Sequence, residues 1–390
     1  MTGKSYASVV TLALGLGLGA CVDSVDVSVE RSELFGTITV DGKTIERLAP
    51  APVAPADQAA VTAFMGGFLA GAVTDFRTAA AAEAAVELAI LDNHGDPVHI
   101  GDVAYVRPGI GNIMFSPAQI YLLSRHFTNV VVMYTNMTDP VGPTGVRAVT
   151  ALEGVPIPAS IAGEVRIWAI GSPELNIISG AQQSDVTLEQ LEILRQNQGL
   201  IGFDPLGNKN WIFAHSQGVF DAVVTDHRLK EAHLNDFKRI VSVAGATQGG
   251  RLIGTPLGDT FVQGAEDAAG DQGRIAFEAL EPSVSIANMI DFLDIQGGNP
   301  ETKQRKAVRK AVWGAFSGSV DPNLPQGNVR AAFLFLAAQP DFRGEVTSND
   351  GVENLDSTSL GKRKHTFVQA DHILLIEDPA ILRTELEIVR

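Results

Sequence analysis

The sequence of 390 residues has a single cysteine and few charged residues, and its acidic residues outnumber its basic ones. With Cys21 alone, disulfide bonds within the chain and metal sites built on several cysteines are excluded. Charged residues make up 19% of the chain, and 45 acidic against 29 basic residues give a net charge of −16. Nucleic-acid binding requires a concentration of lysine and arginine, so this balance argues against a nucleic-acid partner. After the N-terminal segment, no apolar run approaches the ~18 residues of a transmembrane helix.

Apolar residues, in contrast, make up 45% of the chain, which is enough for a sizeable hydrophobic core. This composition is typical of a globular protein, because disordered chains are rich in charge and poor in apolar residues. At roughly 150 residues per domain, the length allows two to three domains, and it equally allows one large α/β domain with insertions.

The N-terminal segment is typical of a bacterial export signal. Lys4 is its only charged residue, and residues 8–18 form an uncharged, largely apolar run of the length found in signal peptides. The run ends in Leu-Gly-Ala before Cys21, a pattern that resembles the lipobox of bacterial lipoproteins. The resemblance implies a signal peptide of residues 1–20 and a lipidated Cys21 that anchors the exported protein in the cell envelope, at the outer membrane or cell surface. An ordinary secretory signal with an incidental cysteine is the alternative.

Residues 21–100 form an N-terminal extension to which the sequence assigns no function. Within it, residues 35–45 alternate in polarity around Asp41 and Gly42, a pair that favours a β-hairpin turn. Residues 56–91 are rich in alanine and predict helix.

Residues 101–390 are predicted to form one α/β domain, because short apolar runs alternate there with amphipathic segments. Such alternation predicts an α/β fold with a mostly parallel central sheet and helices on both faces. Strands are expected at 102–107, 129–134, 164–169, 211–214, 239–244, 331–336 and 366–368, and the clearest helices at 117–126, 188–197 and 217–232. Residues 255–328 are rich in glycine and partly helical, and they are predicted to form a cap or lid insertion.

The most specific local feature is the turn Ala-His-Ser-Gln-Gly at residues 214–218. It joins a predicted strand directly to a predicted helix, which is the arrangement of the Gly-x-Ser-x-Gly nucleophile elbow, with alanine in place of the first glycine. In such a turn the serine hydroxyl projects above the sheet, and small residues on either side allow strand and helix to pack closely. Ser216 is therefore the predicted nucleophile.

A serine nucleophile needs a base, and the base needs a carboxylate that orients it. In α/β-hydrolases the acid and then the histidine follow the serine along the chain. Asp350 lies in a turn-forming segment after the strand at 331–336, and His372 follows the last strand, so both are expected at the same edge of the sheet. Asp356, in the same loop as Asp350, is the alternative acid.

Several motifs, in the same order, resemble the bacterial true-lipase family of α/β-hydrolases. They are residues 106–111, 241–250, 348–352, 357–361 and 371–372. The resemblance spans residues 100–378 and implies an oxyanion hole formed by the backbone N–H groups of Ile110 and Gln217. The chain departs from the family at Pro108, where the family has histidine, and at Leu374, where the family has a calcium-binding aspartate. No calcium ion is therefore expected.

Other residues are weaker candidates. His215 precedes the nucleophile, but its place in the turn favours a structural role. Gly109 and Gly111 begin a dinucleotide-binding pattern in which Met114 replaces the last glycine, so a dinucleotide fold is not expected. Neither a metal nor another cofactor is predicted, since His94, His99 and His126 lack metal-ligand spacing.

These residues predict a serine hydrolase that cleaves carboxylic esters, of the lipase or esterase type. Ser216, His372 and Asp350 would act through an acyl-enzyme intermediate. The expected partners are a small-molecule or lipid ester and, through the lipid anchor, a membrane. Two alternatives stay open: an acyltransferase with the same triad, and a non-catalytic envelope lipoprotein that uses the fold as a binding module.

Overall fold

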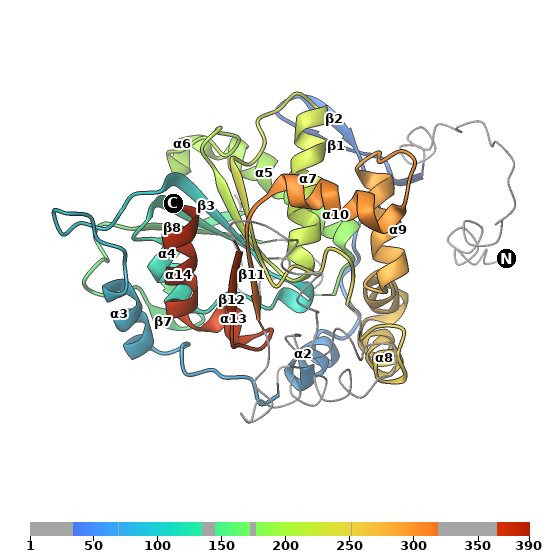
Figure 1. The fold of residues 1–390 in the computed structure, drawn as a ribbon, viewed down its shortest axis with the longest axis horizontal. Coiled ribbons are helices and arrows are strands. Elements are labelled where there is room, and N and C mark those ends of the chain that lie inside the picture. Colours follow the sequence, from blue (N-terminus) through green and yellow to red (C-terminus); the bar gives the residue numbers. More distant parts are fainter. Residues whose placement is uncertain (1–33, 69, 135–144, 172–176, 251, 319–364) are drawn as a thin grey trace, which may run out of the picture.

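A sheet of eight strands forms the centre of the described structure (Figure 1). The computed structural model describes residues 34–68, 70–134, 145–171, 177–250, 252–318 and 365–390. In spatial order the strands are β12 (His365–Val368), β11 (Val312–Gly318), β10 (Arg239–Val243), β9 (Trp211–His215), β3 (Gly101–Arg107), β4 (Phe127–Tyr134), β8 (Arg166–Gly171) and β5 (Val146–Ala148). Neighbouring strands run parallel except β5, which is antiparallel to β8.

Helices cover both faces of this sheet (Figure 1). On one face lie α5 (Gly180–Gln196) and α7 (Gln217–Glu231), and on the other lie α3 (Ala79–Glu87), α4 (Pro117–Leu123) and α14 (Pro379–Val389). Side chains suited to capping begin two of them: Ser116 accepts a hydrogen bond at the start of α4, and Ser179 forms a capping box with Gln182 at the start of α5. The predicted α/β architecture is confirmed.

The central strands are buried on both faces, and their side chains divide between two cores. In β3, Val103 and Tyr105 join the core that contains α5 and α7, whereas Ala104 and Val106 join the core that contains α3 and α4. The division follows from the pleat of a strand, which sends successive side chains to opposite faces. A parallel sheet covered on both sides therefore has a continuous apolar sequence in its central strands.

The described part of the N-terminal extension contains a hairpin of β1 (Thr37–Val40) and β2 (Lys43–Glu46). Its turn residues Asp41 and Gly42 have φ angles of 47° and 74°, the positive values that a tight two-residue hairpin loop requires. The predicted hairpin is thus confirmed. Helix α2 (Gln58–Phe68) follows and packs against α8 (Pro256–Glu278).

The range 255–328, predicted as a cap insertion, holds helices and one strand in its described part. The helices are α8, α9 (Pro282–Phe292) and α10 (Pro300–Ala311). Strand β11 then belongs to the central sheet, between β10 and β12, so the predicted insertion is too long at its C-terminal end and its described helices end at Ala311. Sequence reasoning missed β11 because Gly314 and Ser317, residues of low strand propensity, interrupt it. The strand expected at 331–336 lies outside the described residues.

The predicted lipidation site, Cys21, also lies outside the described residues, so the lipid anchor stays a prediction. Among the helices of the described ranges, none is both long enough and apolar enough to cross a membrane. A short hairpin of β6 (Ala151–Leu152) and β7 (Val155–Pro156) completes the described strands.

Candidate active site

Ser216 lies between the last residue of β9 and the first residue of α7, near the middle of the sheet. Its φ of 52° and ψ of −127° are strained for a residue that carries a side chain. Its N–H donates to the carbonyl of Val243 at 3.0 Å, and its carbonyl accepts from the N–H of Ala246 at 3.1 Å. The turn therefore has the backbone geometry of a nucleophile elbow.

Two glycines permit the close packing around this elbow. A Cβ atom on Gly218 would lie 2.4 Å from the carbonyl oxygen of Pro108, and one on Gly109 would lie 2.8 Å from Cβ of Ser216. Neither separation is possible between non-bonded atoms, so only glycine fits at these positions. The turn after β3 and the elbow are thus in direct contact.

His372 lies between β12 and α13 (Leu374–Glu377) and lines the same cavity as Ser216. The fold therefore brings the predicted base and the predicted nucleophile to one edge of the sheet. The side chain of the neighbouring Asp371 closes a local turn before α13, since its Oδ1 accepts the N–H groups of Ile373 at 2.9 Å and Leu374 at 2.7 Å. These bonds fix the course of the backbone immediately after His372.

His215 is wholly buried between the elbow and the segment that carries His372. Its Nε2 lies 3.1 Å from the carbonyl oxygen of His372, and the two rings are 4.6 Å apart. Because a carbonyl only accepts, Nε2 carries the proton and donates it. Burial, together with the neighbouring His372, lowers the pKa of His215 well below its ordinary value, so the ring is neutral. This arrangement suits the structural role that the sequence favours for His215.

The two predicted oxyanion donors begin helices. Ile110 begins the short 3₁₀ helix η3 (Ile110–Asn112), and Gln217 begins α7. The first N–H groups of a helix have no partner within it, which leaves them available to an anion. Ile110 also lines the cavity at Ser216, and Gly111 after it has a φ of 71°. The arrangement is compatible with the predicted oxyanion hole.

The cavity at Ser216 has a volume of about 40 Å³. Among the described residues that line it, the polar ones are Ser216, His215 and His372. The larger apolar residues come from the turn after β3 and from residues 252–280: Ile110, Ile113, Leu252, Ile253, Phe261, Phe277 and Leu280. An apolar wall beside the predicted nucleophile suits the hydrocarbon part of a substrate.

An ion pair joins the end of β3 to the elbow helix. Arg107 binds Asp221 of α7 through Nε, and both side chains are completely buried. Asp221 also accepts hydrogen bonds from Thr187 at 2.8 Å and Thr225 at 2.9 Å, while Arg107 donates to the carbonyl of Gln183 at 3.1 Å. Both charges are thus paired and hydrogen-bonded, as burial in a low dielectric requires.

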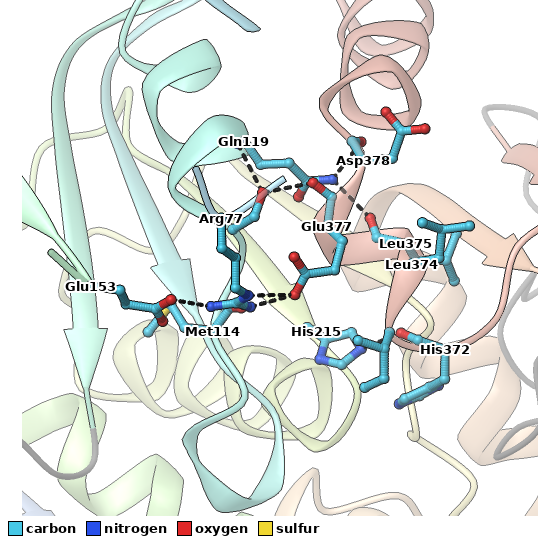
Figure 2. Close-up of polar contacts among 12 residues, drawn as sticks. Arg77, Met114, Gln119, Glu153, His215, His372, Leu374, Leu375, Glu377 and Asp378 are labelled. Carbon is cyan, nitrogen blue, oxygen red and sulfur yellow. Dashed lines mark hydrogen bonds and ion pairs between the residues drawn. The ribbon is translucent and has the colours of Figure 1, made fainter. Parts of the chain in front are cut away.

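A second ion pair joins the end of the same turn to the segment that carries His372. Figure 2 shows Arg77 between Glu153, Met114 and Glu377. Its Nε lies 2.8 Å from Oε1 of Glu377, and its Nη2 donates to the carbonyl of Met114 at 2.7 Å. Sequence reasoning did not single out Arg77 or Glu377, because 300 positions separate them and no local pattern connects them.

The environment of Glu377 is unfavourable for a carboxylate. Burial raises the pKa of Glu377 to about 7, and the charges of Glu153 and Asp371 act in the same direction, whereas Arg77 opposes them. Burial alone would lower the pKa of Arg77, but the two carboxylates outweigh it and raise that pKa. Arg77 therefore stays charged, while Glu377 changes its ionisation near neutral pH.

The predicted acid Asp350 and its alternative Asp356 lie outside the described residues, so the pairing of His372 with a carboxylate stays a prediction. In the part of the chain that the structure describes, no group of three or more histidine, cysteine, aspartate or glutamate residues is placed to hold a metal ion.

No protein-family model matches the sequence, and no curated protein does. Among solved structures, the chain is similar to the mature lipase BlEst2 of Bacillus licheniformis, with 13% identity, a TM-score of 0.44, and coverage of 76% of this chain and 96% of that one. It is also similar to a metagenomic carboxyl esterase, with 14% identity, a TM-score of 0.40, and coverage of 74% and 75%. A thermostable esterase of Pseudomonas putida has 11% identity, a TM-score of 0.33, and coverage of 87% and 95%.

The chain has the α/β-hydrolase fold. Its mostly parallel sheet is covered by helices on both faces, and its sharp turn from β9 to α7 carries the serine. Since one fold hosts many reactions, the reaction has to be argued from the site.

Proposed function

We propose that the protein is a serine hydrolase that cleaves carboxylic esters. The observation that carries the proposal is the strained Ser216, which lies on a cavity that His372 and Ile110 also line. Backbone strain of this kind concentrates at functional sites. A serine at a strand-to-helix turn, with a histidine on the same cavity, is the arrangement of nucleophilic acyl transfer.

In the proposed reaction, Oγ of Ser216 attacks the carbonyl carbon of the ester while His372 takes the hydroxyl proton. The N–H groups of Ile110 and Gln217 hold the oxyanion, and one such donor is worth about 10²–10³ in rate. The tetrahedral intermediate collapses, and His372 gives the proton to the departing alcohol. Water, activated by His372, then releases the acid and restores Ser216. Asp350 is the proposed partner that orients His372.

The cavity supports an ester with a short acyl chain. Its volume of about 40 Å³ holds only a few water-sized groups. Phe261 and Phe277 of α8 bound it on the side of the cap. A long chain would need these side chains to move, so activity should be greatest on short acyl groups.

The test is hydrolysis of p-nitrophenyl esters from acetate to palmitate by residues 22–390 and by Ser216→Ala. The parent is expected to prefer the short esters, and the variant to lose several orders of magnitude in kcat, because no other group replaces the nucleophile. Asn210→Ala, a buried substitution away from the cavity, serves as the control for folding.

Four other results would change the proposal. Equal activity of parent and Ser216→Ala would exclude Ser216 as the nucleophile. An inactive parent whose Ser216 reacts with a fluorophosphonate would keep the nucleophile and reject the ester substrate. Acyl transfer to an added alcohol in preference to water would identify an acyltransferase, and absence of both turnover and labelling would favour the binding module.

A further inference from the structure

The N-terminal part of the chain supplies the side chain that joins two segments of the candidate site. We infer that Arg77 is a positioning residue that holds the turn of Ile110 and the segment of His372 in register for the reaction proposed above. The inference rests on that proposed function, and it assigns a role to part of the N-terminal extension, for which the sequence predicts none.

Arg77 makes its contacts with three separate segments. It lies in the turn before α3, where its own N–H donates to the carbonyl of Thr74 at 3.0 Å. From there its guanidinium reaches Met114, Glu377 and Glu153 (Figure 2). A guanidinium is suited to this task, because its planar group presents five donors in fixed directions.

The two principal partners of Arg77 are near the proposed catalytic groups in the sequence. Met114 is four residues after Ile110, and its carbonyl accepts from Nη2 of Arg77 at 2.7 Å. Glu377 is five residues after His372, at the end of α13, and binds Nε of Arg77 at 2.8 Å. One side chain thus joins the segment that follows the proposed oxyanion turn to the segment that follows the proposed base.

Backbone and side-chain hydrogen bonds reinforce the same junction. Ser116 donates its N–H to the carbonyl of Ile376 at 2.8 Å and its hydroxyl to the carbonyl of Glu377 at 2.7 Å. Gln119 donates to the carbonyls of Leu375 at 3.0 Å and Asp378 at 2.8 Å (Figure 2). These bonds join α4 to α13, and Arg77 is the part of the junction that comes from the extension.

Helix α2 gives the extension a second contact with the site. A Cβ atom on Gly111 would lie 2.0 Å from Cε of Met65, so Met65 packs directly on the turn that begins at Ile110. Phe64 meets Phe277 of the cavity wall edge to face, with ring centroids 5.7 Å apart. The extension therefore packs against both the oxyanion turn and the cap helix.

Arg77 itself does not line the described wall of the cavity. Its loss should therefore leave substrate binding nearly unchanged and act on the geometry of the reacting groups. A displacement of about 1 Å at a site can reduce the rate about 100-fold. The expected signature is a fall in kcat with little change in KM.

The experiment compares Arg77→Met, Arg77→Lys and Arg125→Met in the chain of residues 22–390. Arg125 is the matched control, because its ion pair with Glu164 is away from the cavity and its side chain is 22% exposed, as is that of Arg77. The measurements are kcat and KM on p-nitrophenyl butyrate, the rate of Ser216 labelling by a fluorophosphonate, and folding by circular dichroism.

We expect Arg77→Met to reduce kcat and the labelling rate by about 10- to 100-fold, with KM within about twofold. Arg77→Lys should be intermediate, because an ammonium lacks the planar fork that reaches Met114 and Glu377 together. Arg125→Met should stay within about twofold of the parent.

The inference is overturned if folded Arg77→Met or Arg77→Lys matches Arg125→Met in both kcat and labelling rate. Loss of folding in both Arg77 variants would also overturn it and assign Arg77 to stability alone. If the fluorophosphonate labels the parent but the parent hydrolyses no ester, only the substrate class is rejected, since the labelling rates still test the positioning role of Arg77. A parent that does not label would reject the proposed function and this inference with it.

Discussion

The two ion pairs that flank the turn after β3 differ in their access to water. The inner pair, Arg107 and Asp221, lies at the start of the turn, and both side chains are 0% exposed. The outer pair, Arg77 and Glu377, lies at its end, with side-chain exposures of 22% and 2%. A second carboxylate, Glu153, also binds the arginine of the outer pair.

This difference in environment leads us to expect different roles. The inner pair joins β3 to α7, two elements that pack against each other in the centre of the fold, and its charges are satisfied by protein groups. The outer pair joins segments from opposite ends of the chain, and its carboxylate changes ionisation near neutral pH. We expect the inner pair to control stability and the outer pair to control the geometry and pH response of the site.

The largest effect is expected for Asp221→Asn in the inner pair. The substitution keeps the shape of the side chain but leaves the buried Arg107 without its counter-charge, which should cost about 3–5 kcal/mol of unfolding free energy. Chemical denaturation at pH 7 measures this loss. The control is Asp102→Asn. Asp102 lies on β3, as Arg107 does, and forms an exposed ion pair with Lys209, so its loss should cost less than about 1 kcal/mol of unfolding free energy. Similar losses in the two variants would contradict the comparison.

A smaller, pH-dependent effect is expected for Glu377→Gln in the outer pair. The folded-state pKa of Glu377, about 7, is above the ordinary 4.5, so the folded state favours the protonated form. Its contribution to stability is fully present below pH 4.5 and is lost as the pH rises through about 7. Over this pH window the unfolding free energy of the parent should fall by about 3 kcal/mol relative to that of Glu377→Gln, at about 1.4 kcal/mol per pKa unit.

Denaturation midpoints of the parent and of Glu377→Gln at pH 5, 6, 7 and 8 measure this difference. Glu164→Gln, which breaks the surface pair with Arg125, is the control and should follow the parent at every pH. A stability difference between parent and Glu377→Gln that does not change with pH would show that Glu377 titrates alike in the folded and unfolded states.

The smallest effect is expected at His215, which belongs to neither ion pair. Its bond to the carbonyl of His372, 3.1 Å long, is a single neutral hydrogen bond and is worth about 1 kcal/mol. Glutamine at this position can still donate a hydrogen bond, whereas methionine, which has nearly the same shape as glutamine, cannot. The two variants His215→Gln and His215→Met therefore differ mainly in this bond. We expect His215→Met to have a kcat about fivefold below that of His215→Gln. Equal kcat values in two folded variants would remove His215 from the positioning of His372.

Sequence reasoning was most successful where structure depends on near neighbours. Local patterns predicted the hairpin at Asp41 and Gly42, strands β3 and β9, and the helix after Ser216. It failed at β11, whose place in the sheet comes from its pairing with β10 and β12 and not from its own residues. Pairing partners can override a weak strand propensity.

The sequence by itself determined the alternation of elements and the identity of Ser216 and His372 as candidates, because periodicity, small residues and chain order express them directly. Only the tertiary structure decided that Ser216 and His372 line one cavity and that Arg77 reaches Met114 and Glu377. The physical reason is sequence distance. Contacts between segments up to 300 positions apart arise from the packing of helices on the sheet, which no local pattern specifies.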